Sequence, residues 1–228
     1  MANPNLDLLL AIARALGPLR ERVVFVGGCA TGLLVTNQAV TDIRSTEDVD
    51  AIIEIASLVA YHALRPELTK LGFVQTMQDN TPPFRWLWQR MQLDLVPLDE
   101  KVLGFANAWY RTGFANAVVS HPAPDVSLKH LSAPYFLATK FEAFKDRGRN
   151  DVYASHDLED IITIVDGRAE LADEIAQAPA DVRAYIVSNI QALVDHPEIT
   201  NALPGIVLRS IRATVVMQRL EAIAKIGN

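Results

Sequence analysis

The stretch STEDVDAII, residues 45–53, places acidic side chains directly before an apolar run that is typical of a buried strand. In a strand, residues two apart point to the same face, so Asp48 and Asp50 converge on one point while Val49 faces the core. Burying carboxylates is costly unless a partner compensates their charge. The stretch therefore predicts a strand over 48–55 whose two carboxylates either hold a cation or satisfy N–H groups at the strand edge.

Composition limits the class of protein. The 228 residues, 50% of them hydrophobic, suffice for one large domain or two small ones with a proper core. No apolar run reaches the roughly 20 residues that cross a membrane, and the N-terminal stretch is typical of an amphipathic helix, not a signal peptide. The single cysteine, Cys29, suits a reducing compartment, so we expect a cytoplasmic protein with no membrane partner. A net charge of −6 argues against a large nucleic-acid footprint.

Hydrophobic periodicity predicts an α+β chain, in which a mixed sheet with flanking helices is followed by an all-helical half. The expected strands span 22–26, 48–55, 72–77, 84–89 and 91–97, and the expected early helices span 6–20, 29–40 and 57–71. Prolines give the stretch after residue 116 the character of a linker. Later helices are expected over 134–147, 158–165, 179–195 and 204–226. The expected domains are an α/β core over 1–115 and a helical domain over 116–228.

A glycine pair, Gly27-Gly28, closes the strand over 22–26 and opens a helix. Glycine allows a phosphate to approach the backbone closely, and N–H groups at a helix N-terminus bind anions. Most such pairs are simple turns, so the pair alone leaves phosphate binding and chain reversal both open.

A third carboxylate, Asp94, stands inside the apolar stretch QLDLV, residues 92–96. Strand propensity does not favour aspartate at such a position. If this strand lies beside that of Asp48 and Asp50, the three carboxylates gather and can hold two Mg²⁺ ions. If it does not, Asp94 is an exposed residue on an amphipathic strand.

Lys140 lies on the apolar face of its expected helix, four residues from both Phe136 and Phe144. A buried ammonium needs a carboxylate or phosphate partner, unless its stem carries the charge out to solvent. Asp157 falls in the first turn of the next helix, where the helix dipole favours an acid in any case.

Together, the motifs VGGCATGLL, RSTEDVDAII and QLDLVP resemble the nucleotidyltransferase superfamily, which is built on a DNA polymerase β-like core. Within it, Arg44 and Thr46 ahead of the acid pair resemble the AbiEii-type nucleotidyltransferase toxins. The spacing of 20 residues from Gly28 to Asp48 also fits that subgroup better than the tightest version of the superfamily motif. The resemblance covers residues 20–166.

This resemblance implies a role for each motif, and a helical half that completes the active-site cleft. The implied metal ligands and catalytic acids are Asp48, Asp50 and Asp94, with Asp94 also a candidate general base. The implied nucleotide-binding residues are Gly27, Gly28, Arg44, Thr46 and Lys140. Lys140 is also an implied catalytic residue that contacts the phosphates, and Asp157 positions either Lys140 or the nucleotide.

The implied function is a Mg²⁺-dependent transfer of an NMP from an NTP to a hydroxyl acceptor, with release of pyrophosphate. The resemblance leaves the acceptor open between a tRNA and a protein, and toxin–antitoxin relatives imply an antitoxin protein as partner. Two other classes stay open. One is a catalytically silent nucleotide- or partner-binding module of the same fold, and the other is a purely structural protein.

Several basic residues have two interpretations each. Arg85 either lines the cleft or packs its stem on a neighbouring tryptophan. The cluster of Lys145, Arg147 and Arg149 either meets an RNA acceptor or is solvated at a helix end. The later arginines are expected to form a solvated helix face, and these are Arg209, Arg212 and Arg219.

Overall fold

The computed structural model describes residues 4–37, 43–75, 81–104 and 107–227. It divides the chain into two compact units. The first comprises residues 1–33 and 45–132, and the second comprises residues 34–44 and 133–228. The first unit is built on a mixed sheet and the second on helices, which confirms the α+β prediction. No helix in the described ranges is long and apolar enough to cross a membrane.

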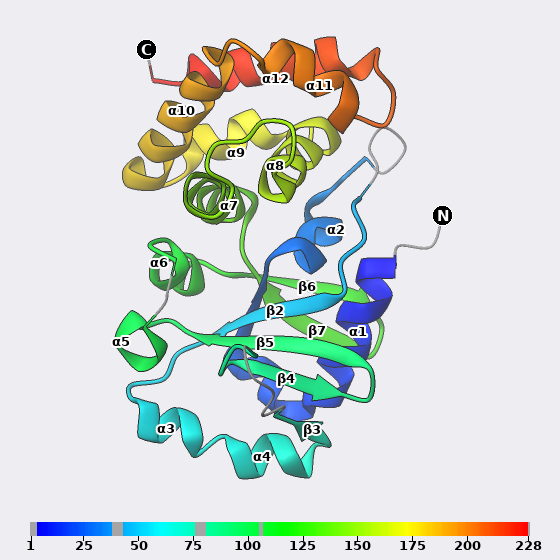
Figure 1. Cartoon of the computed structure of the whole chain (residues 1–228), viewed down its shortest axis with the longest axis vertical. Coiled ribbons are helices and arrows are strands. Elements are labelled where there is room, and N and C mark those ends of the chain that lie inside the picture. The colour runs from blue at the N-terminus through cyan, green and yellow to red at the C-terminus, as the bar shows by residue number, and fades with distance from the viewer. Residues whose placement is uncertain (1–3, 38–42, 76–80, 105–106, 228) are drawn as a thin grey trace. The chain divides into compact units, whose positions relative to one another are not determined.

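Among the described residues, seven strands form one sheet in the order β3-β4-β5-β2-β1-β7-β6 (Figure 1). Their bounds are β1 Val23–Val26, β2 Asp48–Ile53, β3 Phe73–Val74, β4 Arg85–Trp88, β5 Met91–Pro97, β6 Val118–Ala123 and β7 Val126–His130. The pairs β2–β5 and β1–β7 are parallel, and the other pairs are antiparallel. The interior strand β1 reads VVFV and is fully buried, because its β-branched and aromatic side chains suit a covered pleat.

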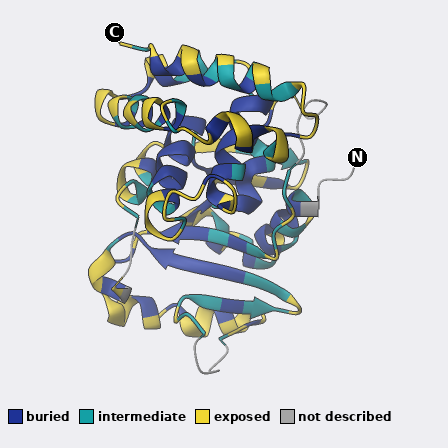
Figure 2. Cartoon of the chain, turned by 45° about the horizontal axis from the view of Figure 1, so that its top comes forward, coloured by how far each residue is buried: buried dark blue, intermediate teal, exposed yellow. Residues whose placement is uncertain are grey.

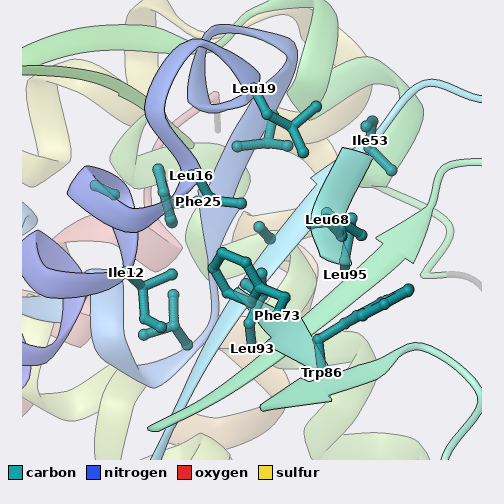
Figure 3. Close-up of a cluster of buried hydrophobic side chains, with 14 of the residues drawn as sticks. Ile12, Leu16, Leu19, Phe25, Ile53, Leu68, Phe73, Trp86, Leu93 and Leu95 are labelled. Atoms are coloured by element: carbon teal, nitrogen blue, oxygen red, sulfur yellow. The ribbon is translucent and has the colours of Figure 1, made fainter. Parts of the chain in front are cut away.

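One face of this sheet carries the apolar core of the first unit. Helix α1 (Pro4–Leu16) places its buried side chains in the same cluster as Phe25 and Leu93. Figure 3 shows Ile12 and Leu16 of this helix on the side of the sheet where these residues lie. Since side chains alternate along a strand, the acids of β2 and β5 are assigned to the opposite face.

The remaining helices of the first unit are short. They are η1 Gly17–Arg22, η2 Gly28–Ala30, α3 Leu58–His62, α4 Arg65–Lys70, α5 Glu100–Leu103 and α6 Tyr110–Ala115, and α2 Thr31–Leu34 crosses into the second unit. The prediction of one helix over 57–71 is wrong, because the chain breaks between α3 and α4 ahead of Pro66. A proline lacks the N–H of the helical ladder and its ring clashes with the carbonyl four residues earlier. The helix expected over 29–40 ends at Leu34, and its part over 38–40 lies outside the described residues.

A hairpin replaces the linker that was expected after residue 116. Strands β6 and β7 extend the sheet, so the first unit runs to Ser132 and not to residue 115. Pro122 lies in β6, which is the edge strand, where a missing N–H is tolerated. The alternating burial of β7 corresponds to the apolar–polar alternation of its sequence, VSLKH. The strand expected over 72–77 contains only Phe73–Val74, and residues 76–77 lie outside the described residues.

The second unit is a set of packed helices. They are α7 Ala133–Asp146, α8 His156–Gly167, α9 Leu171–Gln177, α10 Ala180–Val194, α11 Ile199–Ile206 and α12 Arg212–Ala224. In Figure 2 the buried residues gather on α7 and α8, and the outer helices alternate buried and exposed positions. The helices predicted over 134–147, 158–165 and 179–195 are confirmed. The single helix predicted over 204–226 is wrong, since α11 ends two residues after Pro204 and α12 begins at Arg212.

Two arginines of α12 support the end of α8, which corrects the expectation of a solvated face. Arg212 forms an ion pair with the buried Asp166 at 2.5 Å. Arg219 donates to the backbone carbonyls of Val165 at 2.8 Å and Asp166 at 2.6 Å. Cationic groups at a helix C-terminus satisfy carbonyls that have no partner within the helix. Arg209 is exposed, as predicted.

Candidate active site

The register of the sheet gathers the three predicted acids. Strand β2 runs parallel to β5, with Asp50 directly opposite Asp94 and Asp48 opposite Gln92. One carboxylate oxygen from each of Asp48, Asp50 and Asp94 lies within 4.8 Å of the others. The prediction that the strand of Asp94 lies beside that of the acid pair is therefore confirmed.

The three acids differ in exposure. Asp94 is 5% exposed, whereas Asp48 and Asp50 are half-buried. The hydroxyl of Thr46 donates to Oδ1 of Asp48 at 2.7 Å, and the backbone N–H of Thr46 donates to Asn5 at 3.0 Å. Thr46, predicted to bind nucleotide, therefore orients the Asp48 carboxylate in this structure.

Gly27 allows the Asp50 carboxylate to lie against the end of β1. Its φ is +68°, and a Cβ at this position would be 1.9 Å from Oδ2 of Asp50. Any other residue would both strain the backbone and displace that carboxylate. Gly28 begins the short helix η2, and Ala30 donates back to the Gly27 carbonyl at 3.2 Å. The glycine pair is thus a tight turn beside Asp50, and its contact with a nucleotide phosphate stays a prediction.

Arg85 is the cationic partner of this acid group. It lies opposite Asp94 in the antiparallel pair β4–β5. Its Nε donates to Asp94 Oδ1 at 2.8 Å and its Nη2 donates to Asp94 Oδ2 at 2.7 Å. Nη2 is also 3.7 Å from Oδ2 of Asp48. The hydrogen bonds to Asp94 raise the pKa of Arg85, and the charges of Asp94, Asp48 and Asp50 raise it further, so the guanidinium is always charged.

From the sequence, Arg85 was predicted either to line the cleft or to pack its stem on a tryptophan. Its ion pair with Asp94 was not predicted. A signal existed, because the hairpin of β4 and β5 turns at Gln89 and Arg90, with Trp88 paired to Met91. Residues equally far from a tight turn lie opposite each other in an antiparallel pair. That count places Arg85 opposite Asp94.

A second charged cluster lies within the helical unit. The ammonium of Lys140 is buried, 3.0 Å from Asp157 Oδ1 and 2.6 Å from Asp160 Oδ2. Arg147 donates twice to Asp157, at 2.8 Å in both bonds. Arg44 is 3.8 Å from Asp160 and 3.6 Å from Glu159. The carboxylate partners of Lys140 join α7 to α8, so the cluster has a clear structural role.

The charges of this cluster stabilise one another. Burial alone would lower the pKa of Lys140, but Asp160 and Asp157 more than compensate, and the pKa lies above its usual value. Burial alone would raise the pKa of Asp157, but Arg147 and Lys140 hold it below its usual value. Lys140 is therefore a charged ammonium with two carboxylate partners, and its predicted contact with nucleotide phosphates stays a prediction.

Asp160 is the member of this cluster that sequence reasoning missed. It is 2% exposed, and it lies three residues after Asp157 on α8. Residues three apart lie on the same face of a helix. If Asp157 lies near Lys140, Asp160 is therefore expected to lie near Lys140 as well.

The structure also accounts for part of the predicted basic cluster. Lys145 stacks over the Tyr185 ring at 4.6 Å, and Arg147 pairs with Asp157.

Comparison with known proteins adds little to this geometry. No family model matches the chain, and no curated protein matches it. The crystal structure of JHP933 from Helicobacter pylori is similar over 99% of this chain and 94% of that chain, with 15% identity and a TM-score of 0.48. A likeness this distant carries no argument about function.

The acid group of the first unit fits a divalent cation such as Mg²⁺. All its donor atoms are carboxylate oxygens, which are the ligands that Mg²⁺ prefers. Gly27 leaves the space in which the Asp50 carboxylate lies. The acid group also binds a positive charge within the chain, because the Arg85 guanidinium lies 2.7 Å from Asp94 and 3.7 Å from Asp48. Asp48, Asp50 and Asp94 are therefore the candidate metal ligands among the described residues.

Proposed function

We propose that the protein is a Mg²⁺-dependent nucleotidyltransferase that moves an NMP from an NTP to a hydroxyl acceptor. The observation that carries this proposal is the convergence of Asp48, Asp50 and Asp94, whose oxygens lie within 4.8 Å of one another across two paired strands. Like charges this close repel strongly unless a cation joins them. Arg85 supplies one positive charge, and a divalent ion would supply the remainder.

The reaction exchanges one phosphorus–oxygen bond for another. The acceptor hydroxyl oxygen bonds to the α-phosphorus, the bond from that phosphorus to the bridging oxygen of the β-phosphate breaks, and pyrophosphate leaves with the electron pair. The hydroxyl proton passes to solvent. A bound Mg²⁺ would neutralise the triphosphate and polarise the reacting oxygens.

The side chains of this chain provide positioning and charge. Asp48 and Asp50 would hold the ion, and Thr46 would keep Asp48 in its orientation through the 2.7 Å hydrogen bond. Gly27, which has no Cβ, would leave room for the Asp50 carboxylate in this position. Such fixed charges act without reorganising during the reaction, which is the main source of catalysis in phosphoryl-type transfers.

The finer parts of the proposal rest on the resemblance to AbiEii-type toxins. They are a tRNA or a protein as acceptor, an antitoxin protein as partner, and a cytoplasmic location. The same resemblance supports the proposed roles in nucleotide binding of Lys140, Asp157, Arg44 and Gly28.

A catalytically silent binding module is the second candidate, and one contact favours it. Both oxygens of Asp94 accept hydrogen bonds from Arg85, so the third acid is already neutralised. A silent module would bind NTP with Mg²⁺ but transfer nothing.

Two labelled substrates separate these functions. The purified protein is incubated with Mg²⁺, a tRNA or protein extract, and each NTP carrying the label on either the α- or the γ-phosphate. The proposal expects α-label in the acceptor fraction and γ-label in pyrophosphate. Asp50→Asn should abolish transfer, while Glu54→Gln, an exposed acid directly after β2, should not change it.

Label in neither fraction, together with a Mg²⁺-dependent rise in thermal stability on adding NTP, would support the silent module instead. Neither transfer nor a stability change with any nucleotide would contradict both functions.

A further inference from the structure

We infer that Arg85 takes the place of a second metal ion, so that the acid group binds a single divalent cation, on Asp48 and Asp50. This inference rests on the proposed function, because it concerns the same site. It departs from the expectation of two Mg²⁺ ions, and it assigns Arg85 as a positioning residue.

The first argument is the geometry of the Arg85–Asp94 pair. The two residues face each other across β4 and β5, and both carboxylate oxygens are engaged by the guanidinium fork at 2.8 and 2.7 Å. Such bidentate pairs are among the strongest hydrogen-bonded pairs in proteins. The Asp94 side chain is 6% exposed, so losing its partner would leave a buried charge. A metal that took Asp94 as a ligand would have to displace Arg85 at this cost.

The second argument is the balance of charge. The three carboxylates carry three negative charges, and the guanidinium neutralises one of them. The charge that remains matches one divalent ion and not two. Because Nη2 of Arg85 is also 3.7 Å from Asp48, its positive charge lies near both Asp94 and Asp48. A second dication beside Asp94 would be repelled by it.

The inference also changes the role of Asp94. Both oxygens of its carboxylate are already engaged by the guanidinium fork of Arg85, at 2.8 and 2.7 Å. Asp94 therefore fixes Arg85 and does not act as the general base that the resemblance allowed.

Binding of Mn²⁺ to the full chain, without nucleotide, tests the inference independently of activity. Mn²⁺ replaces Mg²⁺ at oxygen sites, and its free concentration and any coupling between two bound ions are measured by electron paramagnetic resonance. We expect one ion in the wild type. Arg85→Gln should admit a second ion, and Arg90→Gln, an exposed arginine on the same hairpin, should keep the wild-type count.

A second pair of variants keeps the test decisive if Arg85→Gln does not fold. Asp94→Asn should retain the single ion and Asp50→Asn should lose it, with folding of each checked by circular dichroism. Two coupled ions in the wild type would overturn the inference and leave the proposed transferase intact. Loss of the ion in Asp94→Asn would overturn it as well. No bound ion in the wild type would instead contradict the proposed function itself, which needs a divalent cation at these acids.

Discussion

Arg85 and Asp94 lie directly opposite each other on β4 and β5, and the guanidinium donates two hydrogen bonds to the carboxylate. The same row of the sheet continues through Asp50, which is opposite Asp94, to Val26, which is opposite Asp50. One line across four strands therefore carries a cation, two acids and the end of β1, where Gly27 follows. The fold itself, through its register, sets the spacing of these charges.

This arrangement makes Gly27 a test of the acid group. Gly27→Ala would place a Cβ 1.9 Å from Oδ2 of Asp50 at a backbone φ of +68°. We expect Mn²⁺ affinity to fall at least about tenfold, because the Asp50 carboxylate must move, with a loss of about 2 kcal/mol in the free energy of unfolding. Calorimetric Mn²⁺ titration and urea unfolding measure the two effects.

Gly104→Ala is the matched control for that prediction. Gly104 has a φ of +75°, but a Cβ there would meet nothing within 4 Å. It should lose about 1 kcal/mol from backbone strain and keep its Mn²⁺ affinity. Equal Mn²⁺ affinity in both variants would mean that the Asp50 carboxylate is not a metal ligand.

Lys140 distinguishes a structural ion cluster from a nucleotide contact. Lys140→Met removes the ammonium and leaves Asp157 and Asp160 buried, at 3% and 2% exposure, without that partner. We expect a loss of about 3 kcal/mol in the free energy of unfolding. Adding Asp160→Asn should recover part of the loss, because removing both charges of a buried pair is cheaper than breaking it.

The matched control is Lys145→Met, an exposed lysine on the same helix that contacts the Tyr185 ring. Its unfolding free energy should change by less than about 1 kcal/mol. A Lys140→Met variant that is as stable as the wild type but binds NTP weakly would favour the phosphate contact over the structural role.

The acid group could be predicted largely because it depends on local pattern. Because side chains alternate along a strand, Asp48 and Asp50 were predicted to point to the same face. The aspartate inside the apolar stretch QLDLV indicated that its strand lies beside theirs. Arg85 and Asp160 were within reach of the same reasoning, since one follows from hairpin register and the other from helical spacing. The break ahead of Pro66 also follows from a local rule.

Other features depend on contacts between residues far apart in the sequence. The segment over 34–44 belongs to the helical unit, where the N–H groups of Thr36 and Asn37 donate to the Gly167 carbonyl at 3.0 and 2.9 Å. No periodicity in that segment indicates a partner more than a hundred residues later. The hairpin of β6 and β7 was hidden for a different reason. Its prolines suggest a linker, because proline is tolerated in a sheet mainly on an edge strand. The sequence alone does not show that β6 is such an edge strand.

The charged cluster of the helical unit also predicts how stability depends on pH. The pKa of Asp157 lies below its ordinary value of 3.8, so its contribution is present above that pH and is lost as the pH falls through the folded-state pKa. The pKa of Lys140 lies above its ordinary value of 10.5, so its contribution is complete below that pH and is lost as the pH rises through the folded-state pKa. Both contributions are therefore complete only between these two ordinary values.

Urea unfolding from below pH 3.8 to above pH 10.5 should give a free energy of unfolding that falls outside each of these two limits. Asp157→Asn should be less stable than the wild type at neutral pH, and its curve should fall less steeply below pH 3.8, because the variant has no carboxylate to protonate at this position. Asp146→Asn, an exposed acid at the end of α7, should follow the wild-type curve. Acid limbs of equal slope in Asp157→Asn and the wild type would show that the ion pairs of Asp157 do not stabilise the fold.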